Sequence, residues 1–170
     1  MQIRESNSED IAGILAMYPQ AFPDEDLVPV VSELLADVAI RTSLVATIDD
    51  RIVGNVIFTT CGVEGSDVAV AMLAPLAVAP DRQRQGIGSA LVRDGLQRVR
   101  KAGFGLVCVL GDPAYYGRLG FTTETTIDTP YPLPTEWATA WQSQALRDVE
   151  TCAGTLKVPP PWQHPEYWSA

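Results

Sequence analysis

The stretch LAVAPDRQRQGIG, residues 76–88, decides the fold of this chain. An apolar run ends at Val78, Pro80 makes a turn, and Gly86 and Gly88 open a segment whose apolar residues recur at helical spacing. The first turn of a helix leaves backbone N–H groups without intrahelical partners, and the helix dipole adds partial positive charge there. The stretch therefore predicts a strand, a glycine-rich turn that binds an anion, and a helix.

Two well-known phosphate loops do not match this stretch. A P-loop requires Gly-Lys-Ser or Gly-Lys-Thr, but Ile87 follows Gly86 here. The dinucleotide fingerprint requires Gly or Ala at its third position, where this chain has Leu91. The pattern thus disfavours both a P-loop nucleoside triphosphatase and a dinucleotide-binding fold.

Hydrophobic periodicity predicts further strands and helices on both sides of the stretch. A helix after residue 7 is expected to be capped by Ser8 and stopped by Pro19. Three β-branched runs between residues 43 and 78 predict an antiparallel meander. The expected helices are residues 8–18, 27–39, 86–101 and 113–119, and the expected strands are residues 2–6, 43–48, 51–63, 68–78, 106–110, 121–127, 137–142 and 153–158. Residues 128–135 are expected to be a loop and residues 159–170, rich in Pro and Trp, an extended polyproline-like tail.

Composition bounds the class of protein. With 170 residues, 46% of them hydrophobic and 19% charged, the chain is expected to form one domain, residues 1–170. No apolar run approaches the roughly 20 residues of a membrane span, and the charged start does not resemble a signal peptide, so we expect a cytoplasmic protein without a membrane partner. Three cysteines and one histidine predict neither a disulfide framework nor a metal site. We expect Cys61 and Cys108 to be small core residues.

Charge argues against nucleic acid as a partner. The net charge is −9, whereas phosphate neutralisation requires a basic face. Six of the 12 Lys and Arg residues nevertheless fall within residues 82–101. Three of those six lie in the last turn of the expected helix, where cations complement the dipole anyway. Arg82, Arg84 and Arg93 are therefore the ones that bear on an anion at the first turn.

Three blocks of sequence, residues 76–80, 83–88 and 111–121, together resemble the GNAT superfamily of acetyl-CoA-dependent N-acetyltransferases, in particular its YhbS-like branch. The third block reads GDPAYYGRLGF. The resemblance implies a single α/β (α+β) domain with a mixed, mostly antiparallel, splayed sheet flanked by helices. It implies acetyl-CoA as cosubstrate and no metal.

The resemblance also implies which residues bind the cosubstrate. Leu76, Ala77 and Val78 form the strand end along which the pantetheine arm would lie as if it were an added strand. Backbone N–H groups of the turn would hold the pyrophosphate, and the residues concerned are Gln83, Arg84, Gln85, Gly86, Ile87, Gly88 and Ser89. Arg118 either reaches the nucleotide end of the cofactor or is only a solvated surface residue.

Tyr116 matches the family tyrosine that hydrogen-bonds the departing sulfur. With reference pKa values of about 10 for a phenol and about 8.5 for a thiol, proton transfer to a free thiolate is uphill by about 2 kcal/mol, which favours a hydrogen-bond donor over a proton source. Tyr115 lies about 100° away on a helix, so one of the two rings is expected in the core. No base is assigned, because residues 68–78 contain no Asp, Glu or His; the carboxylates left open are Glu25, Asp26, Glu64 and Asp67, beside a water route.

The expected activity is therefore transfer of an acetyl group from acetyl-CoA to a primary amine of a small molecule or peptide, by direct attack. The alternative is a non-catalytic acyl-CoA-binding or regulatory module with the same cleft. The acceptor's identity and a homodimer both stay open. So does the role of the four tryptophans, which are expected at an acceptor pocket, a sheet edge or a subunit contact: Trp137, Trp141, Trp162 and Trp168.

Overall fold

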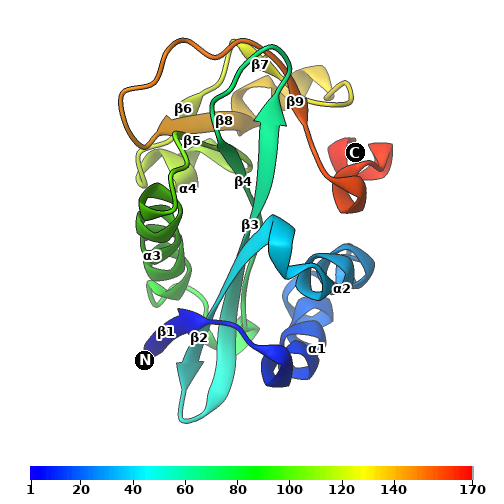
Figure 1. Ribbon diagram of the computed structural model, residues 1–170. Helices are drawn as coiled ribbons and strands as arrows, with labels where there is room; N and C mark the ends of the chain where they lie inside the picture. Colours follow the sequence, from blue (N-terminus) through cyan, green and yellow to red (C-terminus); the bar gives the residue numbers. More distant parts are fainter. Residues whose placement is uncertain (170) are drawn as a thin grey trace. The chain divides into compact units, whose positions relative to one another are not determined.

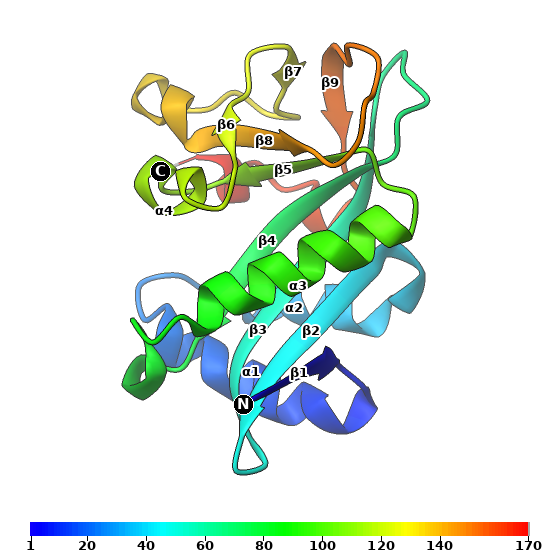
Figure 2. The ribbon, with the colours of Figure 1, turned by 90° about the vertical axis from the view of Figure 1, so that its left-hand side faces the viewer.

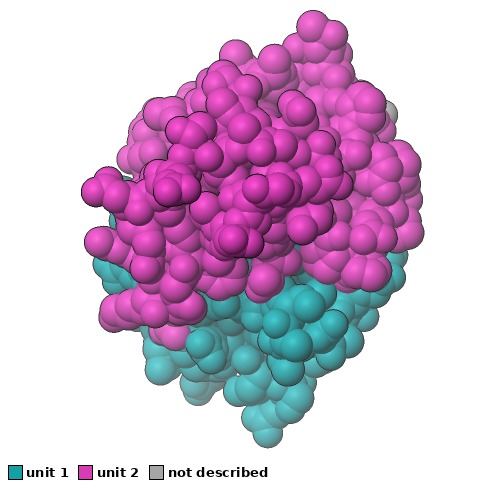
Figure 3. Space-filling view, turned by 45° about the horizontal axis from the view of Figure 1, so that its top comes forward, with its two compact units in different colours: residues 1–59, 74–97 teal, residues 60–73, 98–170 magenta. Residues whose placement is uncertain are grey.

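A computed structural model describes residues 1–169, and these fall into two compact units. Unit 1 comprises residues 1–59 and 74–97, and unit 2 comprises residues 60–73 together with the chain from residue 98 onward (Figure 3). The strand order is β1-β2-β3-β4-β5-β8-β6, with β7 and β9 off this path. Two strands, β3 (Arg51–Val63) and β4 (Val70–Val78), pass from one unit into the other along the chain. The mixed, mostly antiparallel sheet flanked by helices confirms the expected fold class.

Unit 1 is a strand meander with helices on both faces. The strands β1 (Gln2–Glu5), β2 (Arg41–Ile48) and β3 pair antiparallel. The β2–β3 hairpin turns at Asp49 and Asp50, whose φ values of 49° and 61° are those of a primed turn that matches strand twist. The helices α1 (Ile11–Ala21) and α2 (Val28–Ala36) lie on one face of these strands, and α3 (Ile87–Lys101) lies on the other (Figures 1 and 2).

Close packing against β3 fixes α3 in unit 1. Leu91 and Val92 are fully buried, as the helical spacing predicts. Gly95 faces the Phe58 ring so closely that a Cβ there would lie 2.6 Å from Cζ of that ring and nearer still to Cε2. Only a residue without a side chain allows this approach, so Gly95 sets the helix-to-strand distance.

The first two helices differ from the sequence prediction at their ends. Ser8 does not cap α1: a 3-10 turn (Ser8–Asp10) precedes that helix, and Asn7 caps the turn, its side chain accepting from the Glu9 amide. Pro19 does not stop α1, which continues to Ala21 and closes with the Phe22 amide donating to the Tyr18 carbonyl at 2.8 Å. A proline removes one N–H and its ring crowds the carbonyl four residues before it, but the buried side chains of Met17 and Tyr18 stabilise the turn that precedes Pro19. The second helix ends at Ala36 instead of residue 39, and a 3-10 turn (Val38–Ile40) comes after it.

Unit 2 is built around β5 (Leu106–Leu110). This strand pairs parallel with Val70–Leu73 of β4 and antiparallel with β8 (Trp141–Ala145), which also pairs with β6 (Thr122–Thr123). A short helix, α4 (Pro113–Gly117), comes directly after β5. The remaining strands, β7 (Ile127–Asp128) and β9 (Gly154–Lys157), pair parallel, and β9 also pairs with the end of β3 (Figure 1).

The chain after residue 120 departs most from the prediction. The strand expected at residues 121–127 is broken into β6 and β7. The strand expected at residues 137–142 is mostly a 3-10 helix (Thr135–Ala140), and β8 starts only at Trp141. The tail expected to be extended forms two 3-10 turns, Pro160–Trp162 and Pro165–Trp168; Ala170 lies outside the described residues.

Burial of indole rings explains why the tail folds. Trp141, Trp162 and Trp168 are each at most 5% exposed, and the Trp141 and Trp168 rings meet edge to face at 6.1 Å. The Trp168 indole N–H donates to the Trp162 carbonyl at 3.0 Å, which satisfies its polar atom inside the unit. Three of the four tryptophans thus belong to the interior of unit 2, whereas Trp137 is half-buried. Cys108 is a fully buried free thiol, as expected, and Cys61 is half-buried.

Candidate functional site

The end of β4 in unit 1 carries the first group of predicted residues. Side chains alternate along it: Ala77 is buried, whereas Leu76 and Val78 are partly exposed. The strand is held by Ala79, whose amide donates to the Val53 carbonyl at 2.8 Å, and by Gln83, whose side-chain amide donates to the Val78 carbonyl at 3.1 Å. A fixed strand end with one accessible side is what an extended ligand would need.

The turn after this strand has the backbone of an anion cradle. Beyond a 3-10 turn (Pro80–Arg82), Arg84 and Gly86 have φ values of 61° and 82°, in the left-handed region that glycine adopts freely and arginine rarely does. The first hydrogen bond of α3 runs from the Ala90 amide to the Gly86 carbonyl at 3.0 Å. Three amides in the first turn have no helix carbonyl four residues before them to which they could donate. They are therefore available to a ligand: Ile87, Gly88 and Ser89.

Arginines add positive charge at this turn. Arg84 is exposed, and the Arg82 Nε atom is buried with no hydrogen-bond partner within residues 1–169. A buried donor without an acceptor costs free energy, and a bound anion would supply the acceptor. Asp81 is held by Arg51 in a bidentate pair of 2.8 and 3.0 Å, and these hydrogen bonds lower the pKa of the Asp81 carboxyl. The turn thus fits a diphosphate.

In unit 2, the block of residues 111–121 builds a short clamped helix. Asp112 caps α4, its carboxylate accepting from the Ala114 amide at 2.9 Å, and Pro113 occupies the first helical position. At the other end Gly120, with φ 96°, turns the chain so that the Phe121 amide donates to the Tyr116 carbonyl at 3.1 Å. Both ends of this block therefore have a local structural reason for their residues.

The Tyr116 ring sits in a tight slot. A Cβ on Gly111 would lie 3.0 Å from Cδ2 of that ring and closer to Cε2, and the rings of Tyr115 and Phe121 meet it edge-on at 4.9 and 5.6 Å. Only 9% of Tyr116 is exposed. Burial, followed by the neighbouring Tyr115, raises the pKa of the Tyr116 phenol well above its usual range. The phenol therefore stays protonated. Arg118, at the C-cap of α4, is exposed.

Glu124 was not singled out by sequence reasoning, yet it is the most elaborately bonded carboxylate of unit 2. It accepts from the amides of Thr126 at 2.6 Å and Ile127 at 2.9 Å, and from the Ser143 hydroxyl at 2.8 Å. Burial would raise its pKa, but these hydrogen bonds outweigh burial and lower it. No sequence signal could reveal it, because Ser143 comes from β8. All four carboxylates that sequence reasoning left open as bases are exposed: Glu25, Asp26, Glu64 and Asp67.

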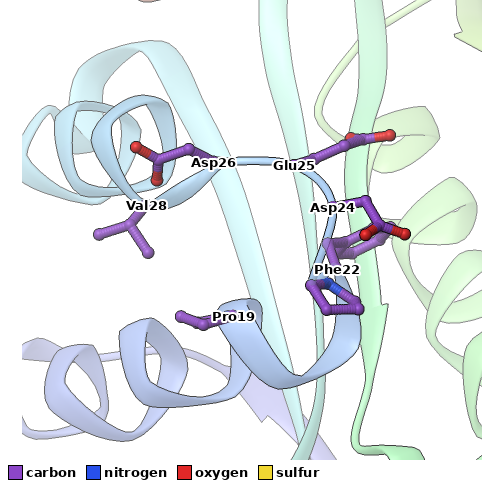
Figure 4. Close-up of a pocket in the computed structure, with 7 residues that line it drawn as sticks. Pro19, Phe22, Asp24, Glu25, Asp26 and Val28 are labelled. Carbon is purple, nitrogen blue, oxygen red and sulfur yellow. The ribbon is translucent and has the colours of Figure 1, made fainter.

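The connection between α1 and α2 in unit 1 forms an acidic cavity of about 320 Å³ (Figure 4). Phe22, Val28 and two prolines supply apolar walls. Its carboxylates all lie on exposed residues, namely Asp24, Glu25 and Asp26. The cavity therefore combines apolar surface with negative charge.

The predicted site residues divide between the two units. Tyr116 and Arg118 belong to unit 2, and the others belong to unit 1: Leu76, Ala77, Val78, Gln83, Arg84, Gln85, Gly86, Ile87, Gly88 and Ser89. Residues 1–169 contain no cluster of three or more His, Cys, Asp or Glu side chains that could hold a metal ion. In the same described part of the chain, every helix is too short or too polar to cross a membrane.

Comparisons with known proteins agree on one family. The family model described as an acetyltransferase (GNAT) domain matches residues 2–123. The uncharacterized N-acetyltransferase YjhQ of Escherichia coli is 34% identical over 148 residues, which are 83% of this chain and 82% of that protein. The structure of E. coli YhbS in complex with CoA superposes with a TM-score of 0.86 at 30% identity, over 96% of this chain and 92% of that one. A Brucella melitensis GNAT acetyltransferase in complex with acetyl-CoA gives 0.79 at 28%, over 95% and 97%.

Proposed function

Because this chain belongs to the GNAT family of acetyltransferases, we propose that it transfers an acetyl group from acetyl-CoA to a primary amine of a small molecule or peptide by direct attack. Family membership makes it an acyltransferase; the donor, the acceptor and the residue roles are the proposal. The observation that carries it is the turn at residues 82–89, which combines open amides, two left-handed residues and a buried Arg82 Nε that has no hydrogen-bond partner among the described residues. The CoA and acetyl-CoA bound by the two structural relatives support the donor.

The residues of unit 1 fit the donor. Amides of Ile87, Gly88 and Ser89, with Gln83, Arg84, Gln85 and Gly86 shaping the turn before them, would hold the diphosphate. Backbone groups of Leu76, Ala77 and Val78 would hold the pantetheine arm like an added strand. Acetyl-CoA supplies the activated acetyl thioester. The protonated amine first gives one proton to water. The neutral amine then forms a bond to the acetyl carbon, whose bond to sulfur breaks; the nitrogen loses a second proton, and the sulfur gains one to become the thiol.

In this proposal Tyr116 donates a hydrogen bond to the departing sulfur. Its raised pKa makes it a poor proton source and a permanent donor over the working pH range. Negative charge that develops on sulfur is stabilised by such a donor more than the neutral thioester is, which is the condition for catalysis. The close packing of the Tyr116 ring against Gly111 and Phe121 supports this role, because a ring that is already fixed needs little reorganisation in order to donate.

The acceptor is proposed to be cationic before it reacts. A lysine-like amine is mostly protonated at pH 7, and negative charge near it raises its local concentration. Carboxylates at the cavity between α1 and α2 support this class of acceptor. All proposed bases other than water are exposed, so much of the rate would come from holding amine and thioester together.

Thiol release tests this function. Acetyl-CoA is mixed with polyamines, aminoglycosides, amino acids or peptides, and free coenzyme A is measured with a thiol reagent. An acetyltransferase releases thiol only when an acceptor is present. Tight acetyl-CoA binding with no release from any acceptor class would instead support a non-catalytic acyl-CoA-binding module.

Tyr116→Phe tests the catalytic assignment. We expect kcat to fall about 100-fold with an unchanged Kd for acetyl-CoA, because the phenol acts only when charge develops. Tyr115→Phe is the matched control: it removes a hydroxyl from the adjacent, half-buried ring and should retain kcat. Full activity of the Tyr116 variant would remove Tyr116 from the mechanism while leaving the family assignment intact. For Arg118→Ala, weaker acetyl-CoA binding would assign it to the nucleotide end, and an unchanged Kd would make it a surface residue.

A further inference from the structure

One exposed ion pair lies directly beside the diphosphate turn of unit 1. Arg51 opens β3 just after the hairpin, and its guanidinium donates to both carboxylate oxygens of Asp81, at 2.8 and 3.0 Å. The two side chains are 51% and 57% exposed. Most exposed pairs contribute little to folding, whereas bidentate geometry makes a pair stronger and fixes the position of the carboxylate.

The same carboxylate has a second arginine within reach. Asp81 Oδ2, which accepts from Arg51, lies 4.0 Å from Arg82 Nε. That nitrogen is buried and has no hydrogen-bond partner in the described chain. If Arg51 were absent, the freed carboxylate would have a competing cation beside it, and its negative charge would stand next to the turn.

The positive charge that the turn can offer to an anion depends on Arg51. Residues 81–84 contain one acid and two arginines, so Asp81 cancels half of the local positive charge unless another cation neutralises it. Arg51 supplies that cation. It binds both carboxylate oxygens of Asp81 and so offsets their charge, although Oδ2 also lies 4.0 Å from Arg82 Nε.

We propose that Arg51 is a positioning residue for the cofactor: by holding Asp81 in a bidentate pair, it offsets the charge of that carboxylate beside Arg82 and reduces its repulsion of the diphosphate of coenzyme A. The inference rests on the proposed function, because it assumes a diphosphate at residues 83–89. Arg51 acts through Asp81 and does not itself touch the ligand.

Calorimetry with coenzyme A as the probe tests the role of the pair. Arg51→Ala should weaken binding about 3- to 10-fold, the effect of one partly screened charge several ångströms from a dianion. Asp81→Asn should bind as tightly as the natural protein or tighter. The double variant, which restores the local charge, should return to within about 2-fold of the natural Kd. High salt should shrink the Arg51→Ala effect, because it screens repulsion.

Other roles for the pair give different patterns. If the pair only holds the shape of the turn, Asp81→Asn should weaken binding as much as Arg51→Ala does. A direct Arg51–phosphate contact predicts that the double variant stays as weak as Arg51→Ala. Either pattern overturns the inference. Lys101→Ala, which removes an exposed cation from the other end of α3, is the control for total charge and should leave Kd unchanged. If the natural protein does not bind coenzyme A, the proposed function fails and this inference with it; if it binds and the series differs, only this inference fails.

Discussion

Replacing Gly111 with alanine tests the slot that holds the Tyr116 ring. The new Cβ would lie 3.0 Å from Cδ2 of that ring and nearer to Cε2, well inside the normal carbon contact distance. The backbone has little freedom to retreat, because the Gly111 amide donates to the Ala140 carbonyl at 2.9 Å and its own carbonyl accepts from the Gln142 side chain at 3.1 Å. The ring must therefore move.

The expected cost is that of overpacking a buried site. Such changes destabilise by about 1–3 kcal/mol, which for a chain of this size lowers the melting temperature by about 2 to 12 °C. Thermal unfolding monitored by circular dichroism measures it. Gly117→Ala is the matched control: it is an exposed glycine in α4, the short helix that carries Tyr116, with open space around its Cβ position, and the change should be neutral or slightly stabilising.

A double-variant cycle identifies the ring as the cause. Tyr116→Leu shortens the side chain, so in that background Gly111→Ala should cost much less than it does beside tyrosine. If Gly111→Ala and Gly117→Ala have the same melting temperature, or if Gly111→Ala destabilises both backgrounds equally, then Gly111 does not make room for the Tyr116 ring. In the proposed mechanism a displaced phenol would lose its hydrogen bond to the sulfur, so we also expect Gly111→Ala to lower kcat more than it raises the KM for acetyl-CoA.

Three further predictions concern stability, each measured by thermal or denaturant unfolding. Gly95→Ala should destabilise by about 1–3 kcal/mol, because its Cβ would overlap the Phe58 ring, and Phe58→Leu in the same background should recover part of the loss; equal costs in both backgrounds would refute that contact. Trp168→Ala should cost about 3–5 kcal/mol, since the ring is 2% exposed, whereas an unfolding curve like that of the natural protein would mean that the tail is not part of the core. Arg4 donates hydrogen bonds of 2.6 and 2.9 Å to Asp10 and thereby lowers the pKa of its carboxyl. The pair therefore stabilises the folded state above the unfolded pKa of about 3.9, and this stabilisation is lost as the pH falls below that value. Arg4→Met should therefore lose less stability between neutral and acid pH than the natural protein does. The same loss of stability in both proteins would contradict the pairing.

Local rules found most elements of the fold and missed their ends. Residues 51–63 and 106–110 were predicted with the bounds that β3 and β5 have, because both runs are rich in residues that favour strands and lie between turn residues. The prediction at Pro19 was wrong, since a proline indicates a helix stop although burial of the neighbouring turn keeps α1 intact to Ala21. The prediction for the tail was wrong for a related reason: prolines favour extended chain, but burying Trp162 and Trp168 outweighs that preference.

The candidate site divides in the same way. The turn at residues 83–89 could be found from letters alone, because glycine spacing after a strand encodes open amides directly. The bond from Ser143 to Glu124 could not, because Ser143 comes from β8, which no local pattern joins to Glu124. The acidic cavity is built from one local segment, residues 19–28, but the shape of that connection depends on how α1 and α2 pack.

By itself, the sequence determined the strand, turn and helix around residues 76–101 and the capped helix after Asp112, since backbone preference and capping act between residues a few positions apart. Only the tertiary structure decided that Gly95 meets Phe58, that Gly111 makes room for Tyr116 and that Arg51 binds Asp81. Packing and ion pairing depend on distances in space, and a linear order of residues does not contain those distances until the chain has folded.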